Sequence, residues 1–215
     1  MRPAVWGARG EWSKAMEVLV IGDSWASARE ADTGIDAGWP HLLSVAASHR
    51  QGISGATAMQ WAADHEGWLS RARHTPADAV IVSLLGNDAR LALEKPGTVG
   101  GELDAGLAHL RTVIDAVLRP LSIVMLYTDP FDGRDVRARL AVSNLNHAIR
   151  RACRGRPVVF ADTGRWLKPQ HFDGSDIHPT RAGHAALARG LAGLIDVHDS
   201  IAVRPSPLQE PAGLS

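Results

Sequence analysis

The sequence predicts a three-layer α/β/α sandwich with an open sheet of about five parallel strands. Two observations predict this fold class. Short aliphatic runs recur along the chain and are apolar almost throughout, which is typical of parallel strands covered on both faces. Between them lie stretches with apolar residues at three- and four-residue steps, which is typical of amphipathic helices. Strands that alternate with helices imply right-handed crossovers, with helices on both faces of the sheet.

Four strands are expected from strong apolar runs and a fifth from a weaker pattern. The strong runs are EVLVIG (17–22), DAVIVSLLG (78–86), LSIVMLYT (121–128) and RPVVFADT (156–163). The weaker strand lies near HRQGISG (49–55). In such a sheet the functional loops collect at the carboxyl ends of the strands.

Helices are expected between these strands, because the apolar residues there recur on one helical face. The expected helices are 39–48, 56–72, 101–118, 135–153 and a last helix that begins after Thr180. Threonine is a favoured N-cap residue, since its hydroxyl accepts a hydrogen bond from a backbone N–H of the first turn.

The chain of 215 residues is long enough for one domain with a substantial core. We expect this domain to span residues 16–198, after an N-terminal extension at 1–15. Residues 199–215 are expected to be a disordered tail, because the end of the chain is rich in Pro, Gly and Ser without periodicity.

Composition and charge exclude several classes of function. Lys and Arg (23) balance Asp and Glu (23), so no overall field favours nucleic acid or an anionic membrane. No apolar run is long enough for a signal peptide or a membrane span. Cys153 is the only cysteine, which excludes an internal disulfide and a cysteine-based zinc site and fits a reducing compartment. A cytoplasmic protein without a cofactor is therefore expected, and the oligomeric state stays open.

Polar and small residues follow the predicted strands and precede the last helix. Because carboxyl ends of parallel strands meet at one edge of a sheet, we expect these residues to lie together. They are Gly22-Asp23-Ser24 after the first strand, Ser54-Gly55-Ala56-Thr57 after the second, Gly86-Asn87-Asp88 after the third, and His178 in DGSDIHPT before the last helix.

These residue types suit nucleophilic catalysis. A serine hydroxyl becomes a good nucleophile when an adjacent histidine takes its proton, which makes Ser24 the candidate nucleophile and His178 the candidate base. The oxyanion formed by attack on an acyl carbonyl needs fixed donors. The candidates are the backbone N–H groups of Ser24 and Gly55 and the side-chain amide of Asn87. A glycine at position 55 leaves its N–H open to an approaching substrate.

Each residue also has a structural interpretation when it is taken alone. Ser24 could cap a helix, Gly55 could be a left-handed turn residue, and Asn87 could form an Asx turn. His178 could be an ordinary loop histidine. Their joint placement at one sheet edge favours catalysis.

Four blocks in order resemble the SGNH, or GDSL-type, hydrolases. The blocks are VLVIGDSW with Ser24, GISGATA with Gly55, LLGNDAR with Asn87 and DIHPTRAGHAAL with His178. The resemblance covers roughly residues 17–195 and implies a flavodoxin-like sandwich with ester, thioester or acyl-transfer chemistry on a serine. An α/β-hydrolase is excluded, because no Gly-x-Ser-x-Gly elbow stands at mid-chain.

The chain departs from the family pattern in two places. Family members usually carry an aspartate three residues before the histidine, where this chain has Ser175. We favour Asp176 as the third catalytic residue, with Asp173, a backbone carbonyl or the Ser175 hydroxyl as alternatives. The family's usual Gly-x-Asn-Asp begins here with Leu85, which either narrows the floor of the site or lies beneath it.

A metal site is the less favoured interpretation of two acidic loops, because neither has a recognised ligand spacing. No metal is therefore expected. The loops contain His171, Asp173, Asp176 and His178 in HFDGSDIH, and Asp129, Asp132 and Asp135 in TDPFDGRD.

The sequence thus predicts a serine esterase that cleaves an ester or thioester of a small or short-acyl substrate through an acyl-enzyme on Ser24. Trp25, directly after the nucleophile, is a candidate for the acyl pocket. The alternatives are an O-acyltransferase or deacetylase acting on a sugar or metabolite, and a catalytically weakened binding module of the same fold.

Overall fold

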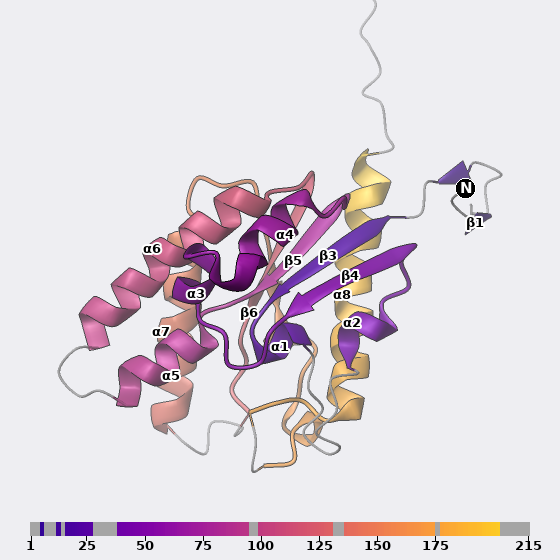
Figure 1. Ribbon diagram of the computed structural model, residues 1–215. Helices are drawn as coiled ribbons and strands as arrows, with labels where there is room; N and C mark the ends of the chain where they lie inside the picture. Colours follow the sequence, from indigo (N-terminus) through magenta and orange to yellow (C-terminus); the bar gives the residue numbers. More distant parts are fainter. Residues whose placement is uncertain are drawn as a thin grey trace, which may run out of the picture.

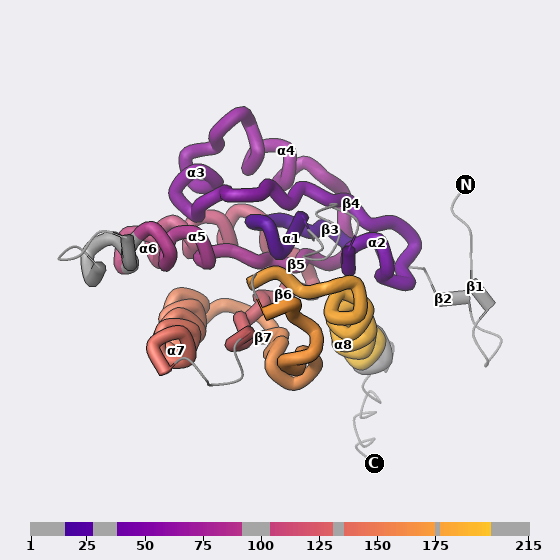
Figure 2. Tube along the Cα trace, turned by 90° about the horizontal axis from the view of Figure 1, so that it is seen from below, coloured from indigo at the N-terminus to yellow at the C-terminus, as the bar shows by residue number. Residues whose placement is uncertain are grey.

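The protein folds around a central sheet whose neighbouring strands are all parallel, in the order β4-β3-β5-β6-β7 (Figure 1 and Figure 2). The computed structural model describes residues 5–6, 12–13, 16–27, 38–94, 99–130, 136–174 and 177–202. This architecture confirms the predicted fold class. The strands are β3 (Glu17–Gly22), β4 (Ala47–Gly52), β5 (Ala79–Ser83), β6 (Leu121–Leu126) and β7 (Val159–Asp162), and β1 (Val5–Trp6) pairs separately with β2 (Trp12–Ser13).

Burial explains why some strands are easier to recognise in the sequence than others. Every residue of β5 and β6 is buried, as is all of β3 except Glu17, so these strands read as continuous apolar runs. Strand β4 lies at an edge of the sheet and is half-buried with the polar sequence ASHRQG. Its sequence pattern is weak because only part of its surface faces the core.

Helices cover both faces of the sheet (Figure 2). On one side α2 and α8 contact each other, and on the other α6 contacts α3, α4, α5 and α7. The helices are α1 (Ser24–Ser27), α2 (Trp39–Leu42), α3 (Ala58–Ala62), α4 (Trp68–His74), α5 (Gly86–Glu94), α6 (Val99–Val117), α7 (Val136–Ala152) and α8 (Arg181–Ala202), with short 3-10 helices η1 (His65–Gly67), η2 (Thr163–Arg165) and η3 (Pro169–His171).

Two predicted helices were wrong in extent. The helix expected over 39–48 ends at Leu42, because Ala47 and Ser48 pair with β3 as the start of β4. The helix expected over 56–72 is broken between α3 and α4, where Asp64 and Glu66 have positive φ angles of 55° and 50°. Helix α5 was not predicted, since its first turn consists of residues that were interpreted as a loop.

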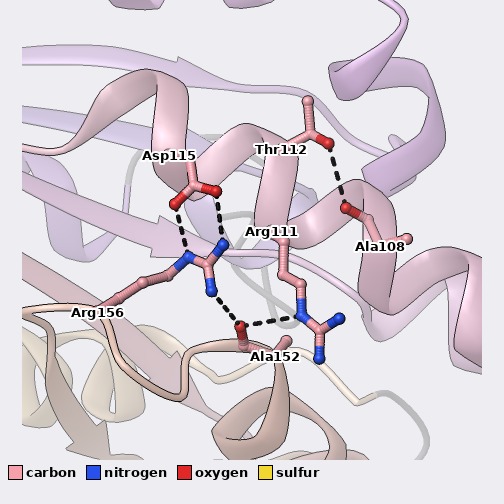
Figure 3. Close-up of polar contacts among 6 residues, drawn as sticks. All are labelled: Ala108, Arg111, Thr112, Asp115, Ala152 and Arg156. Atoms are coloured by element: carbon pink, nitrogen blue, oxygen red, sulfur yellow. Dashed lines mark hydrogen bonds and ion pairs between the residues drawn. The ribbon is translucent and has the colours of Figure 1, made fainter.

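The end of α7 is fastened to α6 by an arginine cluster (Figure 3). The Arg156 guanidinium donates to both carboxylate oxygens of Asp115, at 2.6 and 2.5 Å. Arg156 and Arg111 also donate to the carbonyl of Ala152, the last residue of α7, at 3.2 and 3.3 Å. These bonds satisfy a helix-end carbonyl that has no partner within the helix. They fix the chain just before it enters β7.

Most residues at the two ends of the chain lie outside the described ranges. Helix α8 continues to Ala202, beyond the start of the predicted tail, and residues 203–215 lie outside the described residues. Most of the predicted extension at 1–15 also lies outside them. No helix in the described part of the chain is long and apolar enough to cross a membrane.

Candidate active site

The turns after β3, β4 and β5 begin at the same level of the sheet. Gly22, the last residue of β3, is in register with Gly52 of β4 and Ser83 of β5. A side chain at Gly22 would bring its Cβ to 1.9 Å from the Ser83 carbonyl oxygen, and the residue has a φ of 144°. Glycine is therefore required where the turn that leads to Ser24 leaves the sheet.

Ser24 and His178 meet at this edge although they are 154 residues apart in the chain. Ser24 is the first residue of α1 and is largely buried, with 8% of its surface exposed. The Ser24 Oγ lies 2.8 Å from Nε2 of His178, which is in the loop before α8. This distance is within the range needed for proton transfer from a hydroxyl to a general base.

Gly55 and Asn87 lie on neighbouring turns. Gly55 is exposed and has a φ of 81°, and a Cβ there would meet nothing within 4 Å. Its backbone conformation therefore favours glycine in addition to the open approach expected from the sequence. The Asn87 Nδ2 donates to the carbonyl of Ala56 at 3.0 Å. An amide nitrogen carries two hydrogens, so this bond leaves the second one for another acceptor.

The backbone N–H groups of Ser24 and Gly55 are also suited to donate hydrogen bonds to a bound acceptor. Within the ranges that the structure describes, the backbone N–H groups of Ser24 and Gly55 donate to no protein oxygen. Asp88 braces the same region, because its Oδ2 accepts a hydrogen bond of 2.9 Å from the backbone N–H of Ala58 at the start of α3. Burial raises the pKa of Asp88 above its ordinary value.

Leu85 lies beneath the site and does not narrow its floor, since its side chain is fully buried. Its φ is 93°, a conformation that costs a bulky residue on the order of 1–3 kcal/mol. The side chain packs toward α6, where Leu85 Cδ2 would lie 3.1 Å from a Cβ at Gly106. Burial of a leucine contributes about 1.5–3 kcal/mol, which offsets the strain.

Asp23, which directly precedes Ser24, is buried and accepts hydrogen bonds from two donors. The backbone N–H of Trp25 donates to Oδ1 at 3.0 Å, and the Tyr127 hydroxyl donates to Oδ2 at 2.7 Å. Burial raises the pKa of Asp23 to about 6, although the bonds from Tyr127 and Trp25 act in the opposite direction. The Trp25 ring is buried edge-on against Tyr127, with 5.1 Å between ring centres. Trp25 thus belongs to the core.

No role in the site was predicted for Tyr127, because it lies near the end of a predicted strand, 121–128. It is the single tyrosine of the chain and stands directly after β6, at the edge where the candidate residues collect. That position was the one signal that could have identified it.

The third catalytic residue is not placed by the structure. Asp176 and Ser175 lie outside the described residues, and Asp173 is exposed in the loop after η3. Among the described residues no group of three or more His, Cys, Asp or Glu side chains could hold a metal ion. Asp132 and Asp135 of the second acidic loop also lie outside the described ranges.

Comparison with known structures finds the same fold in an acetylxylan esterase and in a second hydrolase. The acetylxylan esterase Axe2 from Geobacillus stearothermophilus superposes with a TM-score of 0.64 at 20% identity, over 84% of this chain and 94% of that chain. LAE5, described as an alpha/beta hydrolase enzyme from the metagenome of Lake Arreo, Spain, gives a TM-score of 0.64 at 18% identity, over 83% of this chain and 94% of that chain. Both likenesses concern the fold.

A family model identifies the chain more specifically. Residues 20–186 match the GDSL-like Lipase/Acylhydrolase family, and this match contains Ser24, Gly55, Asn87 and His178. Comparison with curated proteins gave no match. The chain therefore belongs to the GDSL-like lipase/acylhydrolase family and is a serine esterase with the SGNH fold.

Proposed function

We propose that this esterase cleaves an ester or thioester of a small or short-acyl substrate through an acyl-enzyme on Ser24. The observation that carries the proposal is the distance of 2.8 Å between Ser24 Oγ and His178 Nε2. A hydroxyl and an imidazole nitrogen at this separation are suited to act as a nucleophile and its general base. The reaction needs no metal or organic cofactor.

The chemical steps follow from this pair. His178 Nε2 takes the hydroxyl proton while Ser24 Oγ bonds to the acyl carbon, which gives a tetrahedral oxyanion. The oxyanion collapses, the bond to the leaving alkoxide or thiolate breaks, and His178 gives the leaving group its proton. Water then attacks the acyl-enzyme with His178 again as base, the bond between Ser24 Oγ and the acyl carbon breaks, His178 returns the proton to Ser24, and the free acid leaves.

The oxyanion is proposed to bind the backbone N–H groups of Ser24 and Gly55 and the second amide hydrogen of Asn87. Two observations support this assignment. Those two N–H groups donate to no oxygen among the described residues. The Asn87 amide is held beside Gly55 by its bond to the Ala56 carbonyl. Removal of one such donor typically costs about 3–4 kcal/mol in the barrier.

Acetyl esters are the first substrates to test, since the fold is shared with acetylxylan esterases. Deacetylation of a sugar is then one form of the proposed hydrolysis. Transfer of the acyl group from Ser24 to an alcohol is the alternative that shares every step up to the acyl-enzyme.

Labelling with a fluorophosphonate tests the proposal. The probe is expected to modify the native protein at Ser24, as located by peptide mapping, and to leave Ser24→Ala unlabelled. The native protein should hydrolyse p-nitrophenyl acetate faster than the octanoate ester, and added sugar acceptors should not divert the acetyl group. If native protein and Ser24→Ala were equally inert to probe and ester, the chain would be a binding module.

Substitution of the two candidate acids tests which carboxylate orients His178. If Asp176 holds the imidazole Nδ1–H, Asp176→Asn should lower kcat by about 100-fold or more, because the carboxylate stabilises the imidazolium formed during reaction. Asp173→Asn should change kcat by less than about threefold on this assignment. The opposite ranking would transfer the role to Asp173. Small effects of both would favour the Ser175 hydroxyl or a backbone carbonyl.

A further inference from the structure

The backbone of Tyr127 is held in place by hydrogen bonds to the Asn146 side chain. The residue follows the last paired position of β6, and its backbone N–H donates to Asn146 Oδ1 of α7 at 2.8 Å. The Asn146 Nδ2 in turn donates to the Tyr127 carbonyl at 2.7 Å. The asparagine side chain thus pairs with the backbone of Tyr127 as a neighbouring strand would. The Tyr127 phenol ring is therefore attached to a well-anchored backbone, and it is buried, with 8% of the residue exposed.

The Tyr127 hydroxyl contacts two turns that come from different strands. It donates to Asp23 Oδ2 at 2.7 Å and accepts a bond of 3.3 Å from the backbone N–H of Gly86. Asp23 directly precedes Ser24, and Gly86 directly precedes Asn87. One hydroxyl can donate once and accept twice, so these bonds are compatible. The phenol therefore links the turn that holds Asp23 and the proposed nucleophile, Ser24, to the turn that holds Gly86 and the proposed oxyanion donor, Asn87.

The surroundings of Gly86 are built for this link. A Cβ at Gly86 would lie 3.1 Å from the Tyr127 hydroxyl and 3.2 Å from Asp23 Oδ2, closer than side chains normally pack. The preceding residue, Leu85, holds its positive φ of 93° in the same turn. Strained backbone persists where the surrounding contacts over-determine it. The bond from Gly86 to the Tyr127 hydroxyl is one such contact.

We infer that Tyr127 is a positioning residue, whose hydroxyl sets the distance between the Ser24 turn and the Asn87 turn. The inference rests on the proposed function, because it matters for catalysis only if both turns serve one reaction. Misplacement of reacting groups by about 1 Å can cost about 100-fold in rate. A shift between these turns would move the Asn87 amide relative to the carbonyl that Ser24 attacks.

Tyr127→Phe tests the inference, because it removes the hydroxyl and keeps the ring that packs on Trp25. We expect kcat for p-nitrophenyl acetate to fall about 10- to 100-fold, with KM changed by less than about twofold. The rates are measured at a temperature where circular dichroism shows the variant folded. Ser122→Ala is the matched control, since Ser122 is also buried on β6 but its hydroxyl bonds to the backbone of Arg119, away from both turns. The control should keep kcat within about twofold.

A double-mutant cycle separates positioning from a general loss of stability. If Tyr127 acts through Asp23, then Tyr127→Phe combined with Asp23→Asn should lower kcat no more than the worse single variant. Hydrogen exchange of the Gly86 amide should also accelerate in Tyr127→Phe. Should Tyr127→Phe fail to fold, Gly86→Ala replaces it, because its Cβ presses on the intact hydroxyl and should give the same kcat loss.

The outcomes distinguish this inference from the proposed function. A native protein that neither hydrolyses the ester nor takes the fluorophosphonate overturns the proposed function. An active native protein with an equally active Tyr127→Phe overturns only the positioning role. Additive losses in the cycle, or a loss in Ser122→Ala equal to that in Tyr127→Phe, overturn it as well.

Discussion

Replacement of Ser24 or His178 by alanine is expected to lower kcat by about 10⁴-fold or more, and the double replacement should lower it no further. The reason is that, in the proposed mechanism, the two side chains act as one unit. Without the imidazole the hydroxyl keeps its proton, and without the hydroxyl the imidazole has no nucleophile to activate. Their contact of 2.8 Å makes the proton transfer direct.

Steady-state kinetics on an activated acetate ester would measure these losses, with circular dichroism to show that the variants are folded. Ser27→Ala and His147→Ala are matched controls. Ser27 lies on the same short helix, where its hydroxyl donates to the Ser24 carbonyl at 3.0 Å, and His147 is exposed on α7. Losses that multiply in the double variant would show that Ser24 and His178 act independently, which contradicts the assignment.

The strands could be predicted from the sequence where both of their faces are buried, because burial favours apolar residues at every position. Strands β3, β5 and β6 are covered on both faces and are therefore apolar throughout. The end of the 39–48 helix could not be predicted, because Ala47 and Ser48 are drawn into β4 by pairing with Glu17 and Val18. That pairing joins residues about thirty positions apart. The spacing of apolar residues within one segment carries no information about such distant contacts.

The candidate site also has features that could be predicted from the sequence and features that could not. The approach of Ser24 to His178 follows from the order of the blocks and from the rule that parallel strands share a carboxyl edge. The bond network of Tyr127 does not follow from any spacing, because its hydroxyl meets Asp23 and Gly86 only after three strands have assembled. The positive φ of Leu85 is equally hidden, since leucine is a residue type that rarely adopts it.

Asn87→Ala is expected to lower kcat by about 100- to 1,000-fold with little change in KM, because in the proposed mechanism the amide donates to charge that develops only in the transition state. The substitution also removes the bond from Nδ2 to the Ala56 carbonyl, which should reduce the free energy of unfolding by about 1 kcal/mol. Asn87→Asp should be at least as inactive, since a carboxylate near the oxyanion repels it.

Kinetics and urea unfolding on the same preparations would separate the two roles of Asn87. Asn144→Ala, an exposed asparagine on α7, is the matched control and should change neither kcat nor stability appreciably. A variant Asn87→Ala that is less stable yet turns over at the native rate would reduce Asn87 to a brace for the Gly55 turn. A large fall in kcat with a small loss of stability requires the second amide hydrogen to reach the reacting carbonyl, because the bond to Ala56 alone is too weak to account for it.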